Sequence, residues 1–335
     1  MGNTCFLASV LQALAATPSI VEFFLSERHD RGACAVAPCA ACALDAYIVD
    51  AYGDGDDALV ASELLYAWWA NERSMANEQQ HDAHECFLSL LSVAHAHLLG
   101  KSLRRKKQKP VGLVALLSLE PLTMCEDDEH ASAPDVSSVD LCDCVFHESF
   151  AGVLQSQFAC ALCGCTASTI REATVGISVD VPSGASKRAN LDECLRNFTA
   201  RESVETSSRR AACSSCDSSQ LSRQMRFERV PKMLNLHLKR FEGGFESASM
   251  RKNDIHVEFP FELDVSPYTT NGDEAALFYE LYAVIVHSGV LEGGHYTAYI
   301  RRAGAWYLCD DAVIREVNDE EVRSAQAFML FYERT

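Results

Sequence analysis

Basic side chains and long hydrophobic runs are both scarce in this sequence of 335 residues. Lysine and arginine number 29 against 47 aspartates and glutamates, so the formal net charge is −18 at pH 7. Such an acidic chain is poorly suited to broad, non-specific binding of nucleic acid, whereas it suits a basic protein partner. No apolar run approaches the roughly 20 residues of a membrane-spanning helix. We therefore expect no direct nucleic-acid binding and no membrane association.

Cysteine, in contrast, is abundant, with 15 residues in the chain. Most of these cysteines stand in close pairs with the spacing C-x-x-C or C-x-C. The pairs are Cys39/Cys42, Cys160/Cys163, Cys213/Cys216 and Cys142/Cys144. Such pairs suit tetrahedral thiolate ligation in a reducing compartment better than disulfide bonds. The cysteine pattern therefore predicts zinc.

The first residues, MGNTCFLASVLQALAAT, allow two readings other than a folded helix. The apolar run resembles the hydrophobic part of a signal peptide, but the positive residues that precede such a run are missing. Gly2 and Cys5 resemble acceptors for myristate and palmitate, but Phe6 stands where the acylation pattern has Ser or Thr. An acylated membrane protein stays an alternative that an intact-mass measurement can dismiss.

The predicted secondary structure changes along the chain from helices to strands. Up to about residue 98, apolar side chains recur at helical spacing, as at Phe6, Val10 and Leu14, and segments 61–72 and 81–99 predict two further helices. After residue 145, strands are predicted within 173–182, 233–241, 254–263, 277–289, 295–302, 305–311 and 327–333. This order predicts the α+β class. A basic run at 101–109 and an acidic segment at 120–141 are expected to be loops.

Three residue types suited to thiol chemistry occur in a suggestive order. Cys5 begins the first predicted helix, whose positive end favours a thiolate. His295 lies in a predicted strand behind two glycines, and Asp310 and Asp311 lie at the end of the next strand. A cysteine nucleophile needs a base and a group that orients the base. Cys, His and Asp in this order therefore form a plausible triad.

Seven segments resemble the catalytic domain of the ubiquitin-specific proteases, a family of papain-like cysteine deubiquitinases. They are GNTCFLASVLQAL, QHDAHECFLSLL, LNLHLKRF, FPFELDVSPY, GGHYTAYIRR, WYLCDDAVI and AFMLFY, in family order over nearly the whole chain. The resemblance implies one catalytic domain over residues 1–335. Its helical thumb would span about residues 1–140, and its β palm and zinc-bearing β fingers about residues 141–335.

The resemblance also implies a role for each candidate catalytic residue. Cys5 would be the nucleophile, His295 the general base and Asp310 the group that orients the imidazole, with Asp311 in support. The expected activity is hydrolysis of the isopeptide bond after the C-terminal glycine of ubiquitin.

By the resemblance, Asp82 and Glu85 lie where the family grips the basic tail of ubiquitin, and a solvated helix face is the alternative explanation of both. Carboxylates can pair with arginine through charge-assisted bonds.

One feature of the family pattern has no counterpart in this sequence. The family carries an oxyanion-donating Asn five residues before the nucleophile, which here is one residue before Met1, and Asn3 is not its equivalent. Because one oxyanion donor is worth roughly 10²–10³ in rate, we expect this chain as written to be impaired. The alternative to a deubiquitinase is a truncated or impaired scaffold that binds ubiquitin without useful turnover.

The cysteine pairs fall into as many as three structural zinc sites. Two C-x-x-C pairs, Cys160/Cys163 and Cys213/Cys216, form a four-thiolate set that the resemblance places at the tips of the fingers, with Cys165 as a nearby spare. The second predicted site is made of His29, Cys34, Cys39 and Cys42. The third predicted site is made of Cys142, Cys144, His147 and His95, with His97 as the alternative to His95.

The zinc-rich thumb, together with FFLSERH, narrows the resemblance to the histone deubiquitinases of the SAGA transcriptional coactivator. That subfamily removes ubiquitin from a monoubiquitinated core histone and works with adaptor subunits. The resemblance implies ubiquitin and a ubiquitinated histone as substrates, SAGA-like adaptors as partners, and a nuclear location, with the cytoplasm as an alternative. The basic run at 101–109 adds little as a nuclear address.

Overall fold

The computed structural model describes residues 3–53, 59–77, 79–100, 142–183, 188–205, 213, 215, 216, 218, 220–242, 251–272, 276–290 and 293–335. Within these residues helices come first and strands follow, which confirms the α+β class. The expected loops at 101–109 and 120–141 lie outside the described residues, as does Gly2. The boundary between thumb and palm near residue 140 therefore stays a prediction.

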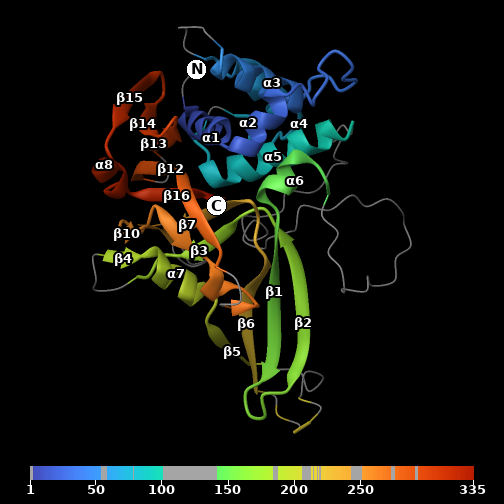
Figure 1. Ribbon diagram of the computed structural model, residues 1–335, viewed down its shortest axis with the longest axis vertical. Coiled ribbons are helices and arrows are strands. Elements are labelled where there is room, and N and C mark those ends of the chain that lie inside the picture. The colour runs from blue at the N-terminus through green and yellow to red at the C-terminus, as the bar shows by residue number, and fades with distance from the viewer. Residues whose placement is uncertain are drawn as a thin grey trace.

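Helices from the first hundred residues form the thumb, on one side of the molecule (Figure 1). They are α1 (Cys5–Ala15), α2 (Pro18–Leu25), α3 (Ala40–Ala51), α4 (Ser62–Asn71) and α5 (Ala83–Leu98). In α1, 9 of the 11 residues are buried, because apolar or small side chains cover nearly its whole circumference. A core helix of this kind has the same composition as a signal peptide, which explains the resemblance seen in the sequence.

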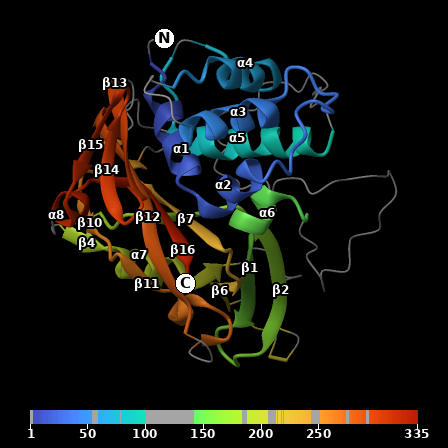
Figure 2. The same cartoon turned by 45° about the horizontal axis from the view of Figure 1, so that its top comes forward.

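The palm is a sheet of 8 strands beside the thumb helices (Figures 1 and 2). Its strands follow the order β15-β14-β13-β12-β16-β7-β3, and β11 also pairs with β12. Their bounds are β3 (Ile177–Asp180), β7 (Met233–Lys239), β11 (Glu262–Asp264), β12 (Phe278–Val290), β13 (Gly293–Arg302), β14 (Ala305–Asp310), β15 (Val313–Val317) and β16 (Ala327–Arg334). The strands predicted from alternation are confirmed, and segment 254–263 divides into two short strands, one of them outside this sheet.

The palm sheet is buried on both faces, as the strand β12 shows. Ala283 and Ile285 belong to the core shared with the thumb. Val284 and Val286 belong to a second core on the other face, where helix α7 (Leu191–Phe198) packs. Successive side chains of a strand point to opposite faces, so a strand between two cores must be apolar at every position. This explains why residues 281–286 of β12 form a continuous apolar run.

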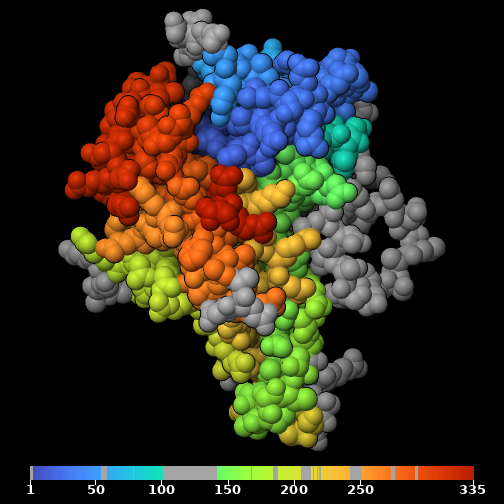
Figure 3. Space-filling model, in the orientation of Figure 1, coloured from blue at the N-terminus to red at the C-terminus, as the bar shows by residue number. Residues whose placement is uncertain are grey.

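The fingers are a separate sheet that projects from the palm (Figures 1 and 3). Its order is β2-β1-β6-β5, with β1 (Gly152–Cys160), β2 (Thr166–Thr174), β5 (Arg201–Glu205) and β6 (Gln220–Arg229). Helix α6 (Val145–Phe150) leads from the thumb into β1. The other short elements are β4 (Arg188–Asn190) with β10 (His256–Glu258), β8 (Phe241–Glu242) with β9 (Arg251–Lys252), η3 (Ser266–Tyr268) and α8 (Asp319–Arg323).

Among the described helices none is by itself long and apolar enough to cross a membrane. The pair α1 and α2, bent by 78°, meets that test only when the two are counted together, and by length and composition alone.

Candidate active site and metal clusters

Cys5 is the first residue of α1 and is buried where the thumb meets the palm. It belongs to the same apolar cluster as Tyr296 of β13, the residue that follows His295. Thr4, which precedes the helix, makes no capping bond with its side chain, and the first turn contains no acidic residue. The amide groups of this turn therefore keep their partial positive charge, and such a terminus stabilises an anion placed on it.

His295 and Asp310 form a hydrogen-bonded pair on adjacent strands of the palm. Nε2 of His295 on β13 lies 2.6 Å from Oδ1 of Asp310 at the end of β14. The two side chains are 42% and 49% exposed, so the pair faces a surface that a substrate can reach. Since the carboxylate accepts the Nε2 proton, Nδ1 is the basic nitrogen of the neutral ring.

Asp311 lies in the turn between β14 and β15, in a left-handed conformation with a φ of 50°. Its carboxylate, the imidazole of His295 and the carboxylate of Asp310 lie within 4.8 Å of one another. Among the described residues there is no hydrogen bond between Cys5 and His295. Catalytic hydrogen bonds are often long in a ligand-free enzyme and tighten in the substrate complex. In the structure the predicted base, His295, is therefore hydrogen-bonded to Asp310, and the Cys5 thiol lies on the adjacent helix α1.

A contact that the sequence analysis missed joins the thumb to the hairpin of His295. The amide N–H of Gly294 donates to Oε1 of Gln80, 2.8 Å away. Gly294 must be glycine, since a Cβ there would lie 1.9 Å from Nε2 of His287. Gln80 is the first residue of the segment QHDAHECFLSLL, so the motif itself was the available signal.

Asp82 and Glu85 lie at the start of α5, where Asp82 is the N-cap. Its Oδ1 accepts from the amides of His84 at 2.7 Å and Glu85 at 3.0 Å. Burial raises the pKa of Asp82, and these two bonds oppose the rise. Burial also raises the pKa of Glu85, as do the charges of Asp82 and Glu72. No described cation forms an ion pair with either carboxylate, so this acidic site suits a basic ligand.

The four predicted finger cysteines are gathered at one place. Cys160 and Cys216 have sulfur atoms 3.5 Å apart, and so do Cys163 and Cys213. All four sulfurs lie within 4.8 Å of one another. This spacing is far too long for a disulfide and close to the edge of about 3.8 Å that a tetrahedral Zn–S₄ site would have. Cys165 is exposed and lies outside the group.

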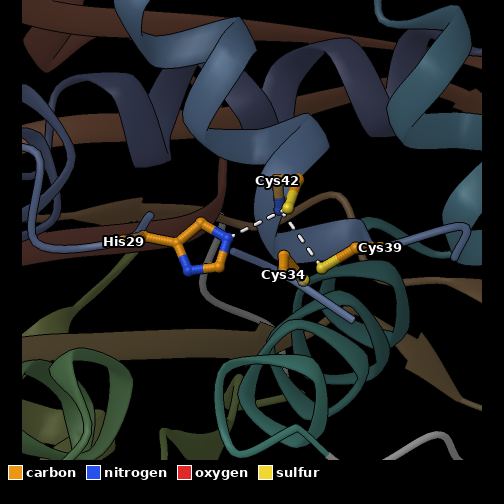
Figure 4. Close-up of side chains that lie close together, drawn as sticks. All are labelled: His29, Cys34, Cys39 and Cys42. Atoms are coloured by element: carbon orange, nitrogen blue, oxygen red, sulfur yellow. Dashed lines mark hydrogen bonds between the residues drawn. The ribbon is translucent and has the colours of Figure 1, made fainter. Parts of the chain in front are cut away.

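The second predicted set also converges. Figure 4 shows the side chains of His29, Cys34, Cys39 and Cys42 pointing toward one another, and their ligand atoms lie within 4.8 Å. Nε2 of His29 is 3.1 Å from Sγ of Cys42. The Cys42 amide donates to Sγ of Cys39, which caps helix α3. One imidazole and three thiolates are a common donor set for structural zinc.

The third set draws its members from α5 and the segment before β1. Nδ1 of His95 lies 3.0 Å from Sγ of Cys144, and Nδ1 of His147 lies 3.1 Å from the same sulfur. Cys142 completes the group. His97, the alternative ligand, lies outside it, because its Nδ1 accepts the Ala40 amide at 2.8 Å. The three clusters fit a tetrahedral metal by number and type of donor.

Comparison with known proteins gives a consistent result. Residues 1–332 match the ubiquitin carboxyl-terminal hydrolase family. Ubiquitin C-terminal hydrolase 22 of Arabidopsis thaliana is 32% identical over 380 residues, which cover 99% of this chain and 62% of the relative. Ubiquitin carboxyl-terminal hydrolase 22 of Homo sapiens is 30% identical over 373 residues, which cover 100% of this chain and 65% of the relative. The chain thus spans somewhat less than two thirds of these relatives.

Solved structures show the same relationship. The SAGA DUB module Ubp8/Sgf11/Sus1/Sgf73 bound to monoubiquitin matches with a TM-score of 0.78 and 27% identity, over 100% of this chain and 68% of the matched chain. The module bound to ubiquitin aldehyde matches with a TM-score of 0.79 at 27% identity and the same coverage. The palm, fingers and thumb described above therefore have the ubiquitin-specific protease arrangement, and this chain belongs to the ubiquitin carboxyl-terminal hydrolase family.

Proposed function

We propose that this protein is a thiol-dependent deubiquitinase that hydrolyses the isopeptide bond after the C-terminal glycine of ubiquitin. The observation that carries the proposal is the contact between His295 and Asp310 at the surface beside the uncapped start of α1, where Cys5 lies. The relatives are hydrolases of the ubiquitin C-terminus by name, and the matched SAGA module was solved with ubiquitin aldehyde.

The geometry supports a papain-like division of labour. The Cys5 thiolate attacks the isopeptide carbonyl, and the amides at the start of α1 donate to the oxygen that becomes negative. His295 delivers a proton from Nδ1 to the departing lysine amine and then takes one from the water that releases the acyl-enzyme. Asp310 holds the ring at Nε2 and stabilises the imidazolium that forms.

The entrance to this site has features suited to the ubiquitin tail. Asp82 and Glu85 supply negative charge without a described cationic partner, which fits a basic segment. Gly293 and Gly294 precede His295 and leave little side-chain bulk beside it, which suits two consecutive glycines in the substrate.

The metal clusters have a structural role in this proposal. Each of the three sets offers four protein donors, so a bound zinc ion would have no open position for substrate or water. Zinc would hold the tip of the fingers and two parts of the thumb in place, and no step of the reaction passes through it. We propose zinc occupancy of the finger set first, with up to three ions per chain.

The substrate and partners follow from the relatives. The matched structures contain Ubp8 with the SAGA subunits Sgf11, Sus1 and Sgf73. We propose that this chain acts on a monoubiquitinated histone in a SAGA-like module in the nucleus. The net charge of −18 is compatible with a basic protein substrate.

The first test is labelling by ubiquitin that carries a C-terminal electrophile, followed by peptide mapping of the adduct. An adduct on Cys5 that is lost in Cys5→Ala is the expected result, since it requires both ubiquitin recognition and a reactive thiol. Binding of ubiquitin without an adduct would instead support the scaffold alternative.

A further inference from the structure

His295 is carried by a hairpin that extends beyond the body of the palm sheet. Strands β12 and β13 pair as far as Val290 and Gly293, and His295 lies opposite Ser288. The other neighbour of β12, strand β16, ends its pairing at Val286. In the described part of the chain, the segment of β12 opposite His295 therefore has β13 on one side and no strand on the other.

Lys252, the last residue of β9, lies at that open edge. Its Nζ donates to the carbonyl oxygen of His287 at 2.8 Å and to that of Gly289 at 3.1 Å. Carbonyl groups alternate in direction along a strand, so those of alternate residues point to the same side. The ammonium group therefore takes the place of the amide donors that a further strand would supply.

Lys252 is unusual for a lysine because its side chain is largely withdrawn from water. The Lys252 side chain is only 9% exposed. Its Nζ lies 3.5 Å from Oδ1 of Asp254, whose side chain is 72% exposed. An ammonium group withdrawn from water is costly unless its donors are satisfied. The two carbonyls and the carboxylate can accept all three of its donors. Without Lys252, the two carbonyls at this edge would lose their donor.

A contact through His287 connects this edge to the strand of the base. The His287 ring lies against Gly294, since a Cβ at Gly294 would be 1.9 Å from Nε2 of His287. The centroid of the His287 ring is 4.5 Å from the centroid of the Tyr296 ring. Gly294 and Tyr296 flank His295 in β13. A shift of β12 at His287 would therefore move both neighbours of His295.

We propose that Lys252 is a positioning residue for His295: it holds the projecting hairpin at the distance from α1 that the reaction needs. The kinetic consequence rests on the proposed deubiquitinase function, whereas the effect on the hairpin rests on the geometry alone. Gln80 fixes the same hairpin from the thumb, so the base is held from two sides.

The test compares Lys252→Met, which keeps the length of the stem and removes the donors, with Lys252→Arg, which keeps the charge and the donors. The control is Lys239→Met. Lys239 is 44% exposed and forms one surface ion pair, with Asp180, at the other side of the palm sheet. The zinc-loaded chain is assayed with ubiquitin bearing a C-terminal aminocoumarin, and amide hydrogen exchange is followed at residues 293–298.

We expect Lys252→Met to lower kcat by about tenfold or more and to change KM by less than about twofold, because misplacing a catalytic group lowers the rate more than binding. Lys252→Arg should recover most of the rate, Lys239→Met should match the unaltered chain, and only Lys252→Met should exchange faster at residues 293–298. Unchanged kcat in Lys252→Met, or an equal loss in Lys239→Met, would overturn the inference.

Two further outcomes are also decisive. If the unaltered chain releases no aminocoumarin, the proposed function fails, and the exchange measurement alone decides whether Lys252 holds the hairpin. If Lys252→Met does not fold, Lys252→Gln replaces it under the same criteria. The stem of this variant is one bond shorter than that of lysine, and its amide has two donors and no charge, so it does not reproduce the three contacts of the ammonium group. A normal rate and normal exchange would therefore overturn the inference.

Discussion

Two neighbouring aspartates at the candidate active site differ in what they contact. Asp310 accepts a hydrogen bond from the His295 ring at 2.6 Å, whereas Asp311 lies in the turn that follows, with its carboxylate near the ring. The strand pattern places both at the end of a strand, and the family resemblance assigned the imidazole to Asp310. The pairing of β14 with β13 brings Asp310 to the ring.

This difference predicts unequal losses of activity. Asp310→Ala should lower kcat on the order of 10²-fold, because the imidazolium loses its partner and the ring its orientation. Asp311→Asn should lower it by much less, since Asn tolerates the left-handed backbone at this position. Turnover of ubiquitin aminocoumarin measures both, and equal losses would show that the ring is held by the two carboxylates together.

At the scale of secondary structure, Asp82 at the start of α5 has two roles. Asp82 caps the helix through one oxygen, and its charge belongs to the acidic site proposed for the ubiquitin tail. Motif matching indicated the second task and missed the first, although Asp is among the preferred N-cap residues. A loss of binding in an Asp82 variant could therefore come from a frayed helix as well as from a lost charge.

Two substitutions separate these tasks. Asp82→Ala should lower the free energy of unfolding by about 1 kcal/mol, whereas Asp82→Asn, an equally good cap, should leave it nearly unchanged. Both should weaken ubiquitin binding, since both remove the charge. Denaturant unfolding and calorimetric titration with ubiquitin measure the two effects.

Asn190→Ala is the matched control for this pair. Asn190 caps α7 by accepting from the Glu193 amide at 2.7 Å, on the face of the palm away from the thumb. This variant should lose stability and keep its affinity for ubiquitin. Normal ubiquitin binding by Asp82→Asn would mean that the carboxylate serves the helix alone.

At the scale of the whole molecule, the chain has two apolar cores on opposite faces of the palm, and the fingers project away from the core shared with the thumb. Among the described residues, the distal end of the fingers has few large buried side chains, and its chain segments meet at the cluster of Cys160, Cys163, Cys213 and Cys216. A small unit with little apolar burial commonly needs a metal or a disulfide for stability.

Loss of the proposed zinc ion should therefore loosen the fingers and leave the thumb intact. Cys213→Ser should reduce the zinc content by one ion per chain and speed hydrogen exchange in β1 and β6, with little change in α1 and α5. Cys165→Ser is the matched control, because Cys165 is exposed and outside the cluster. Native mass spectrometry counts the ions, and an equal content in both variants would contradict the assignment of the cluster.

Several predictions from local sequence agree with the structure because local physics decides them. Apolar spacing located α1, α4 and α5 within one or two residues, and C-x-x-C spacing identified pairs that share a cluster. The choice between His95 and His97 was open in the sequence, since the two are separated by one residue. The helix turns His97 toward the amide of Ala40 and His95 toward Cys144, and this depends on how α3 packs on α5.

The sequence by itself determined the α+β class and the family and predicted the candidate catalytic residues, because periodicity, cysteine spacing and motif order are properties of a linear chain. Contacts between distant segments were decided by the tertiary structure alone. Gln80 binds the amide of Gly294, 214 residues away, and Lys252 binds the carbonyl of His287. Both contacts use backbone atoms, which are alike at every residue, so no periodicity in the sequence specifies the two partners, and only the family motif marked Gln80 as a residue of interest.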